Sequence, residues 1–171
     1  MPDGRQLTFV LGGARSGKSR HGEALIEAHP APWSYIATAQ AFDEEMRARI
    51  TEHRARRDER WTVLEAPLEL GEALSAIDEG RPVLVDCLTL WLTNVMLAGH
   101  DVEAKCQQLA EVLKRPRGPW VLVSNEVGFG IVPDNTMARQ FRDAAGKLNQ
   151  MVAAEADSVV FMVAGLPMKV K

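Results

Sequence analysis

The chain is short of cysteine, of net positive charge and of long apolar runs, and each shortage excludes a class of protein. Its two cysteines, Cys87 and Cys106, lie outside metal-binding spacings such as CxxC, which indicates free thiols in a reducing compartment. The formal net charge of −3 over 171 residues disfavours nucleic acid as the main partner. The N-terminal segment "MPDGRQLTFV" has no long apolar run and so does not resemble a signal peptide. No segment reaches the roughly 18 apolar residues that a membrane span needs, so we expect a cytoplasmic protein without a membrane span.

Apolar, β-branched runs alternate with helical patterns along the sequence. The segments that read as strands are 7–11, 34–38, 61–66, 82–88, 119–128 and 157–170, the last as one or two strands. The segments that read as helices are 16–29, 42–58, 67–78, 90–98, 101–115 and 133–156. Because nearly all-apolar strands alternate with helices, the pattern predicts a mostly parallel sheet with helices on both faces. Without repeats or linkers, we predict one three-layer α/β domain over residues 1–171.

The segment "GGARSGKS", residues 12–19, fits the phosphate-loop pattern G-x-x-x-x-G-K-[ST]. A predicted strand precedes it and a predicted helix follows, which is the context that this motif requires. Its glycines allow successive backbone N–H groups and the helix N-terminus to point at phosphate oxygens. Lys18 would supply a charge to the β and γ phosphates, and Ser19 would ligate Mg²⁺. The sequence therefore predicts a nucleoside triphosphate site.

An acidic partner for the metal is expected at the end of another strand. The run "VLVD" ends at Asp86 and the run "VLVSNE" ends at Glu126. Both would lie at the carboxyl ends of strands, where open α/β sheets bind ligands. We favour Asp86 as the metal or water ligand, with Glu126 as the competitor; either could instead be an ordinary acidic residue in a turn.

The stretch "MRARITEHRARRDERW", residues 46–61, places one histidine, His53, among six arginines. On a helix, Phe42, Met46, Ile50, His53 and Arg57 would form one stripe whose first half is apolar. One interpretation is a partly buried histidine that is hydrogen-bonded to its surroundings, among arginines on a solvated face. The other is a nucleophile at phosphorus, kept neutral by the surrounding arginines, which would also bind phosphate oxygens.

Together these motifs resemble the bifunctional adenosylcobinamide kinase/adenosylcobinamide-phosphate guanylyltransferases of cobalamin biosynthesis. The similarity runs through "GGARSGKSRHGEAL", "YIATAQAFDEEMRARITEHRARR" and "VDCLTLWLTN", and resumes at "VSNEVGFGIVPDN" and "VAGLPMKVK". It covers nearly the whole chain and is weakest around residues 99–118. The resemblance implies a RecA-like P-loop fold and a homotrimer.

The resemblance also implies two reactions on one nucleotide-binding domain. The first phosphorylates the aminopropanol hydroxyl of adenosylcobinamide, with ATP or GTP. The second transfers GMP from GTP to that phosphate through a guanylylated histidine, which falls on His53, and gives adenosylcobinamide-GDP and pyrophosphate. Mg²⁺ is the implied cofactor, with Ser19 and Asp86 as its ligands. The implied catalytic residues are His53 and Lys18, and the implied nucleotide contacts are Gly13, Ala14, Arg15, Ser16, Gly17, Lys18, Ser19, Arg20, Thr38, Ala39, Gln40, Arg54, Ala55, Arg56, Arg57, Glu65 and Asp86.

Two other functions are compatible with a phosphate loop. A P-loop kinase of another small molecule would transfer a γ phosphate without forming a covalent nucleotide. A RecA-like ATPase or nucleic-acid-binding module would be expected to carry a basic surface, which this acidic chain lacks. No residue pattern in the sequence predicts a tetrapyrrole-binding pocket. Asp86, Glu65 and Glu126 are all candidates for the general base of the kinase step.

Overall fold

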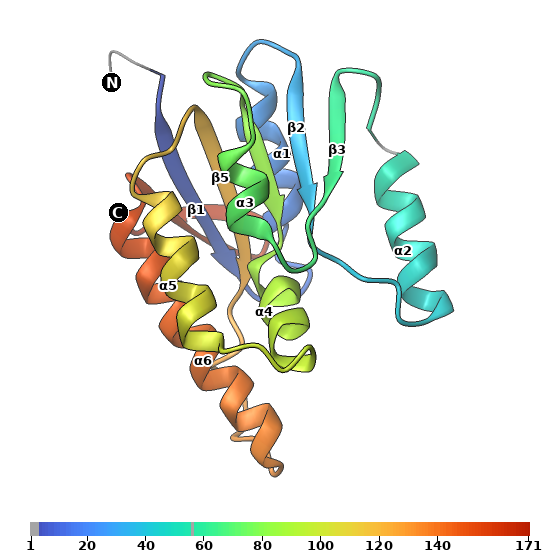
Figure 1. Cartoon of the computed structure of the whole chain (residues 1–171), viewed down its shortest axis with the longest axis vertical. Helices are drawn as coiled ribbons and strands as arrows, with labels where there is room; N and C mark the ends of the chain where they lie inside the picture. Colours follow the sequence, from blue (N-terminus) through green and yellow to red (C-terminus); the bar gives the residue numbers. More distant parts are fainter. Residues whose placement is uncertain (1–3, 56) are drawn as a thin grey trace.

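A seven-stranded, mostly parallel sheet forms the centre of the protein, as the strand pattern predicts (Figure 1). The computed structural model describes residues 4–55 and 57–171, and for Arg49, His53 and Arg54 it describes only the backbone. The strands lie in the order β3-β2-β4-β5-β1-β6-β7, and β7 alone among them pairs antiparallel, with β6. Their bounds are β1 Gln6–Gly12, β2 Trp33–Ala37, β3 Trp61–Glu65, β4 Val83–Asp86, β5 Pro119–Asn125, β6 Ser158–Val163 and β7 Leu166–Lys169.

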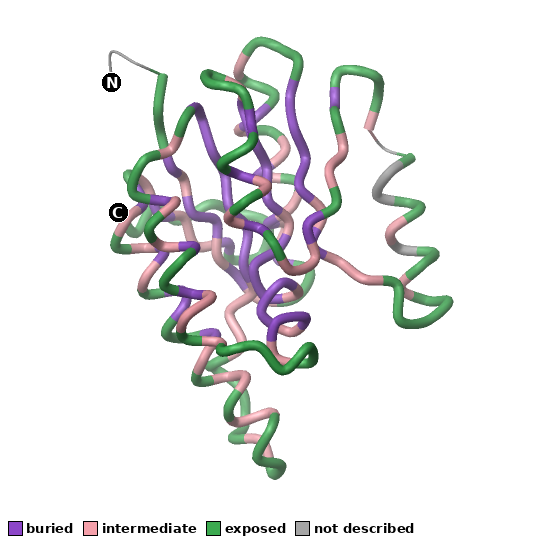
Figure 2. Tube along the Cα trace, in the orientation of Figure 1, coloured by how far each residue is buried: buried purple, intermediate pink, exposed green. Residues whose placement is uncertain are grey.

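Helices cover both faces of the sheet, so there are two apolar cores (Figures 1 and 2). The helices are α1 Lys18–Glu27, α2 Glu44–Ala55, α3 Leu70–Ser75, α4 Leu88–Leu97, α5 Val102–Leu113 and α6 Thr136–Glu155. The larger core lies between the sheet and α3, α4, α5 and α6. The smaller core lies on the α1 face and includes Ile26, Tyr35 and Trp61. Alternate strand residues such as Phe9 and Val10 point into different cores, which explains why the strand segments are apolar throughout.

Helix α1 packs unusually close to the sheet because it carries Gly22 at the contact. A Cβ atom at this position would come within 3.0 Å of Leu84 and 3.2 Å of Val123, which belong to β4 and β5. The glycine therefore lets the helix that follows the phosphate loop lie directly on the strands whose ends carry the other polar residues of the site. This close approach fixes the loop relative to the carboxyl edge of the sheet.

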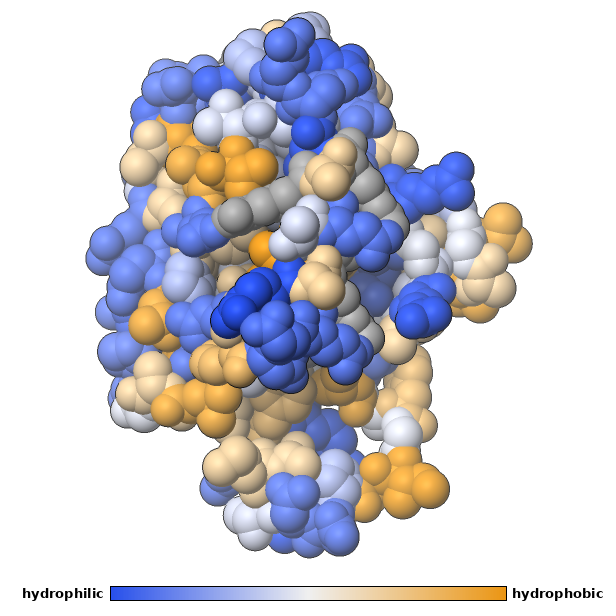
Figure 3. All heavy atoms as spheres, turned by 90° about the vertical axis from the view of Figure 1, so that its right-hand side faces the viewer, coloured by the Kyte–Doolittle hydropathy of each residue, from blue (hydrophilic) through white to orange (hydrophobic). Residues whose placement is uncertain are grey.

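Helix α2 lies at the edge of the molecule, beyond β3 (Figure 1). Its outer surface is hydrophilic in the view that faces it (Figure 3). The helix is shorter than the predicted 42–58, because the Asp43 side chain accepts from the N–H of Met46 at 2.7 Å and so caps its first turn. The predicted stripe is therefore only partly right: Met46 and Ile50 line a cavity, but Phe42 precedes the helix and is 67% exposed, and Arg57 follows it.

Cys87 and Cys106 are free, as the sequence predicts, and both are buried. In the part of the chain that the structure describes, there is no helix that is long and apolar enough to cross a membrane.

Candidate functional site

The phosphate loop connects β1 to α1 and folds as its motif predicts. Strand β1 ends at Gly12 and α1 begins at Lys18, with Gly17 at the N-cap in a left-handed conformation (φ 93°) that favours glycine. A Cβ atom on Gly12 would lie 2.6 Å from the Ser16 hydroxyl, so only glycine fits there without a shift. The hydroxyl of Ser16 is buried and has no hydrogen-bond partner among the described residues. A buried, unpaired donor beside a helix N-terminus is suited to a phosphate oxygen.

Lys18 is buried within this loop, and its ammonium group donates to the carbonyl of Gly13 at 2.6 Å. Burial lowers the pKa of Lys18 from its ordinary value, while the nearby Cys87 and Asp86 act in the opposite sense. An added negative charge such as a phosphate would stabilise the protonated form further. The ammonium group of Lys18 therefore lies where it can neutralise the charge of a bound polyphosphate.

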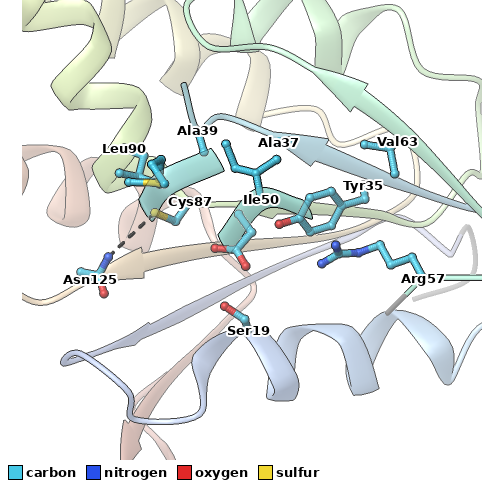
Figure 4. Close-up of a pocket in the computed structure, with 12 residues that line it drawn as sticks. Ser19, Tyr35, Ala37, Ala39, Ile50, Arg57, Val63, Cys87, Leu90 and Asn125 are labelled. Carbon is cyan, nitrogen blue, oxygen red and sulfur yellow. Dashed lines mark hydrogen bonds between the residues drawn. The ribbon is translucent and has the colours of Figure 1, made fainter. Parts of the chain in front are cut away.

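A cavity of about 300 Å³ lies beside the last residue of the phosphate loop, Ser19 (Figure 4). Its lining residues come from α1, α2 and α4, from β2, β3, β4 and β5, and from the segments that follow β2, β4 and α2. Ser19 and Asp86 both line it, together with Tyr35, Arg57 and Asn125. The remaining lining residues are Ala37, Ala39, Met46, Ile50, Val63, Cys87 and Leu90.

The guanidinium of Arg57 lies in this cavity wall, where it is almost completely buried. Its side chain is 4% exposed, donates to the Glu23 carboxylate at 2.7 Å, and stacks 3.4 Å from the ring centroid of Tyr35 (Figure 4 shows the stacked pair). Glu23 follows Ser19 by one turn of α1, so the arginine ties the segment after α2 to the phosphate-loop helix. The predicted contact of Arg57 with phosphate stays a prediction, and in this structure the group is turned toward Glu23.

Asp86 is positioned by a buried polar network at the carboxyl ends of β2 and β4. The side chain of Thr38, which is fully buried, accepts from the N–H of Cys87 at 2.9 Å and donates to its carbonyl at 2.7 Å. Asn94 of α4 donates to the carbonyl of Thr38 at 2.7 Å, and the amide of Asn125 lies 3.8 Å from the Cys87 sulfur. The hydroxyl of Thr38 thus both donates and accepts a hydrogen bond within the protein. Burial raises the pKa of Cys87 to about 11, so this thiol stays neutral in the site.

The other predicted site residues fall into four groups. Ala14, Arg15 and Arg20 are exposed on or beside the phosphate loop, and Ala39 and Gln40 lie half-buried just after β2. Glu65 and Ala55 are exposed at the ends of β3 and α2. The side chains of His53, Arg54 and Arg56 lie outside what the structure describes, so their roles stay predictions.

Glu126, the competitor of Asp86, lies in a different setting. Its backbone N–H donates to the carbonyl of Gly12 at 2.9 Å, and its carboxylate accepts from the N–H of Gly128 at 2.6 Å. The carboxylate thus stabilises its own turn, and it is not among the residues that line the cavity of Ser19. The geometry favours Asp86 over Glu126 as the partner of Ser19.

The oxygen donors of Ser19 and Asp86 fit Mg²⁺. They line the same cavity, and no cluster of three or more His, Cys, Asp or Glu residues able to hold a metal occurs within residues 4–55 and 57–171. Mg²⁺ at phosphate sites is held by one or two protein oxygens, with water and substrate phosphates completing the octahedron. A hydroxyl plus a carboxylate is such a donor set.

Two residues of the site, Tyr35 and Glu23, were not singled out from the sequence. Glu23 follows Ser19 by four residues in a helix, a spacing that puts both on one face and could have drawn attention to it. Tyr35 shares the strand face of Ala37, but no sequence pattern pairs it with an arginine more than 20 residues away.

Comparisons with known proteins show the family of the chain. A family model described as "Cobinamide kinase / cobinamide phosphate guanyltransferase" matches residues 8–170. The chain is 50% identical to the bifunctional adenosylcobalamin biosynthesis protein CobP of Pseudomonas aeruginosa, over 95% of this chain and 96% of that protein. It is 42% identical to the corresponding protein CobU of Escherichia coli K12, over 96% of this chain and 99% of that protein.

Solved structures with low sequence identity support the fold alone. The ATPase EscN of the enteropathogenic E. coli type III secretion system aligns with a TM-score of 0.59 at 12% identity, over 95% of this chain and 45% of that chain. The RadB recombinase aligns with a TM-score of 0.50 at 15% identity, over 91% and 73% of the two chains. The predicted RecA-like α/β fold is confirmed. With the full-length family match, the chain belongs to the cobinamide kinase / cobinamide phosphate guanyltransferase family.

Proposed function

We propose that the chain performs both reactions of its family at one triphosphate site, the phosphate loop facing the inner side of α2. The observation that carries this proposal is the shared cavity, which joins Ser19 and Asp86 to Met46 and Ile50 of α2. Position 53 lies three residues after Ile50 and seven after Met46, spacings that share one helix face. The helix that carries the candidate nucleophile thus borders the site where the triphosphate would bind.

In the kinase step, the hydroxyl oxygen of adenosylcobinamide attacks the γ phosphorus of ATP or GTP. A new O–P bond forms, the bond to the β-phosphate oxygen breaks, and the nucleoside diphosphate leaves. Lys18 and the loop N–H groups neutralise the charge on the phosphates, and Mg²⁺, when bound by Ser19 and Asp86, offsets more of it. The hydroxyl proton passes to a carboxylate at this edge, for which Asp86, Glu65 and Glu126 are the candidates.

In the guanylyl step, the neutral imidazole of His53 attacks the α phosphorus of GTP and pyrophosphate leaves. The N–P bond formed in this way is a phosphoramidate. The phosphate oxygen of adenosylcobinamide phosphate then attacks the same phosphorus, which releases the imidazole and gives adenosylcobinamide-GDP. Because His53 carries the GMP between two in-line displacements, the bulky corrinoid need not meet GTP directly.

The test is covalent labelling with GTP that carries ³²P at the α phosphorus. The protein is incubated with Mg²⁺ and labelled GTP, denatured, and exposed to acid or to alkali. We expect a label that survives alkali, is lost in acid and is absent from His53→Ala. The matched control is His100→Ala, an exposed histidine in the α4–α5 loop, which should keep the label. An unlabelled wild-type protein would contradict the covalent mechanism.

The family resemblance also leads us to expect a homotrimer in the cytoplasm. Exposed apolar side chains at Phe129 (85% exposed) and Ile131 (97% exposed) are compatible with an interface between copies. Light scattering coupled to size-exclusion chromatography gives the molar mass directly, and a monomer at working concentration would contradict the trimer.

A further inference from the structure

The C-terminal motif "VAGLPMKVK" contains none of the residues assigned to the two reactions, yet it forms a hairpin that contacts the phosphate loop. Strand β6 runs beside β1, and Met162 of β6 lies opposite Gly12, the first residue of the loop. Strands β6 and β7 are joined by the two-residue turn Ala164–Gly165. The turn therefore follows directly on the part of β6 that lies beside the start of the loop.

The hairpin meets the phosphate loop at both of its ends. A Cβ atom on Gly12 would lie 3.0 Å from the Cβ of Met162, so the first glycine of the loop lies close against β6. At the other end, the N–H of Gly165 donates to the carbonyl of Ser16 at 3.0 Å. A Cβ atom on Gly17 would lie 3.4 Å from the Cα of Gly165, so the two backbones pack side by side.

The hydrogen bond to Ser16 determines where the next N–H group of the loop points. In a trans peptide, the carbonyl of one residue and the N–H of the next point in opposite directions. Because the Ser16 carbonyl is directed at Gly165, the N–H of Gly17 points away from the hairpin. That N–H makes no backbone hydrogen bond within residues 4–55 and 57–171. It belongs to the N-cap of α1, and N–H groups at helix N-termini bind phosphate oxygens.

The turn has a backbone conformation that most side chains disfavour. Ala164 has φ 50° and Gly165 has φ 79°, both positive as in the type I′ turns that join paired strands. Glycine adopts such angles readily, whereas a β-branched residue does not. No atom lies within 4 Å of a Cβ atom built on Gly165. Position 165 therefore calls for glycine because of its backbone angle and not because of space.

We propose that the turn Ala164–Gly165 is a positioning element of the nucleotide site. Its Gly165 N–H fixes the peptide between Ser16 and Gly17, so that the N–H of Gly17 faces the phosphates before the nucleotide binds. The inference rests on the proposed function, since it takes the phosphate loop as the triphosphate site. It gives the C-terminal hairpin a part in both reactions, because both use the same loop.

Two variants of Gly165 test this role. Gly165→Val forces the turn into another conformation, which moves the N–H away from the Ser16 carbonyl. We expect the Kd of a fluorescent GTP analogue to rise by about tenfold, because one hydrogen bond to a charged phosphate is weakened. Gly165→Asn should keep the Kd within about twofold of wild type, since asparagine tolerates the left-handed conformation and retains the N–H.

Gly80 offers a matched control for the strain itself. It has φ 81°, no atom lies within 4 Å of a Cβ atom built on it, and it precedes β4 at the opposite edge of the sheet. Gly80→Val should therefore lower the urea midpoint about as much as Gly165→Val does, but leave the Kd unchanged. If Gly165→Val does not fold, the milder pair Gly165→Ala and Gly80→Ala gives the same comparison, with a smaller rise in Kd expected for Gly165→Ala alone.

The outcomes separate this inference from the function on which it rests. If Gly165→Val and Gly165→Ala bind the GTP analogue as tightly as the wild type, the turn does not position the loop and the inference is wrong. If Gly80→Val raises the Kd as much as Gly165→Val, loss of stability alone explains the effect, which also overturns it. If the wild-type protein does not bind the GTP analogue at all, the proposed function fails, and the role of the turn fails with it.

Discussion

The ion pair between Arg57 and Glu23 should contribute measurably to stability, because one of its partners is almost removed from water. The arginine side chain is 4% exposed and the glutamate side chain 26% exposed, with 2.7 Å between the bonded atoms. A hydrogen bond between charged groups contributes about 1.5–3 kcal/mol, so Glu23→Gln should lower the free energy of unfolding by about 2 kcal/mol. The stacking on Tyr35 at 3.4 Å remains in this variant.

Replacing the arginine should cost more than replacing the glutamate. Arg57→Met removes the ion pair, the stacking on Tyr35 and the donor of the remaining contacts, and should cost about 3–4 kcal/mol. The double variant should cost less than the sum of the two, because a glutamine at position 23 and a methionine at position 57 leave no unpaired charge. We therefore expect an interaction free energy of about 2 kcal/mol between positions 23 and 57.

Urea unfolding followed by tryptophan fluorescence measures this cycle, since Trp61 lies 5.9 Å from the Arg57 guanidinium. Glu23→Gln should also lower the melting temperature by about 4–8 °C, given about 2–4 °C per kcal/mol for a chain of this length. The exposed pair Arg60–Asp58, with side chains 56% and 51% exposed, is the matched control, and Asp58→Asn should leave the urea midpoint unchanged because water screens the pair. Additive costs at positions 23 and 57 would refute the reasoning. A Kd for GTP that rises in Arg57→Met but not in Glu23→Gln would show that the arginine also binds phosphate.

Three further predictions concern the loop, its helix and a buried thiol. Lys18→Ala should raise the Kd of a fluorescent GTP analogue by roughly 10- to 100-fold, because a charged hydrogen-bond donor to the phosphates is lost. An unchanged Kd would mean that the nucleotide does not bind at this loop. Gly22→Val should lower the free energy of unfolding in urea by about 1–3 kcal/mol, since its side chain would meet Leu84 and Val123; an unchanged value would mean that α1 can lift from the sheet at no cost. Because folding raises the pKa of Cys87 from 9.0 to about 11, the unfolded chain ionises first, and stability should fall between pH 9 and 11. Burial raises the pKa of Cys106 to about 11 as well, so it adds to the loss in the same range. In urea, Cys87→Ala should recover about 2–3 kcal/mol of this loss, and an equal loss in the variant would assign it to other groups.

The parts of the molecule that the sequence predicts well are those decided by neighbours in the chain. The phosphate loop is one of them, because strand, glycines, Lys18 and helix are contiguous. The helix around Met46 is shorter than its sequence pattern predicts, because helical periodicity does not show that Asp43 caps the first turn. The same pattern is right that Met46 and Ile50 face inward, where they line the cavity.

The contacts that the sequence leaves out join segments far apart in the chain. Arg57 meets Glu23 across 34 positions, and Thr38 meets Cys87 across 49. Patterns of hydrophobicity and charge describe each segment separately, so they indicate that a charged or polar residue is present but not which partner it finds. The sequence therefore indicates Arg57 as a possible phosphate ligand, which stays a prediction, but it does not indicate that the same side chain pairs with Glu23 of α1.

One phosphate loop can serve two reactions because they take place at different phosphorus atoms. The α and γ phosphorus atoms of a triphosphate are separated by two bridging oxygens, so a fixed nucleotide presents them at different places. In the proposed function the hydroxyl of adenosylcobinamide attacks the γ phosphorus, and His53 attacks the α phosphorus from α2. Kinase activity and self-guanylylation should therefore be separable: His53→Ala should spare phosphorylation of adenosylcobinamide, whereas changes in the loop, such as Lys18→Ala, should impair both. If His53→Ala abolished phosphorylation at unchanged nucleotide affinity, the two reactions would share an essential group, and two separate approaches to the triphosphate could not be upheld.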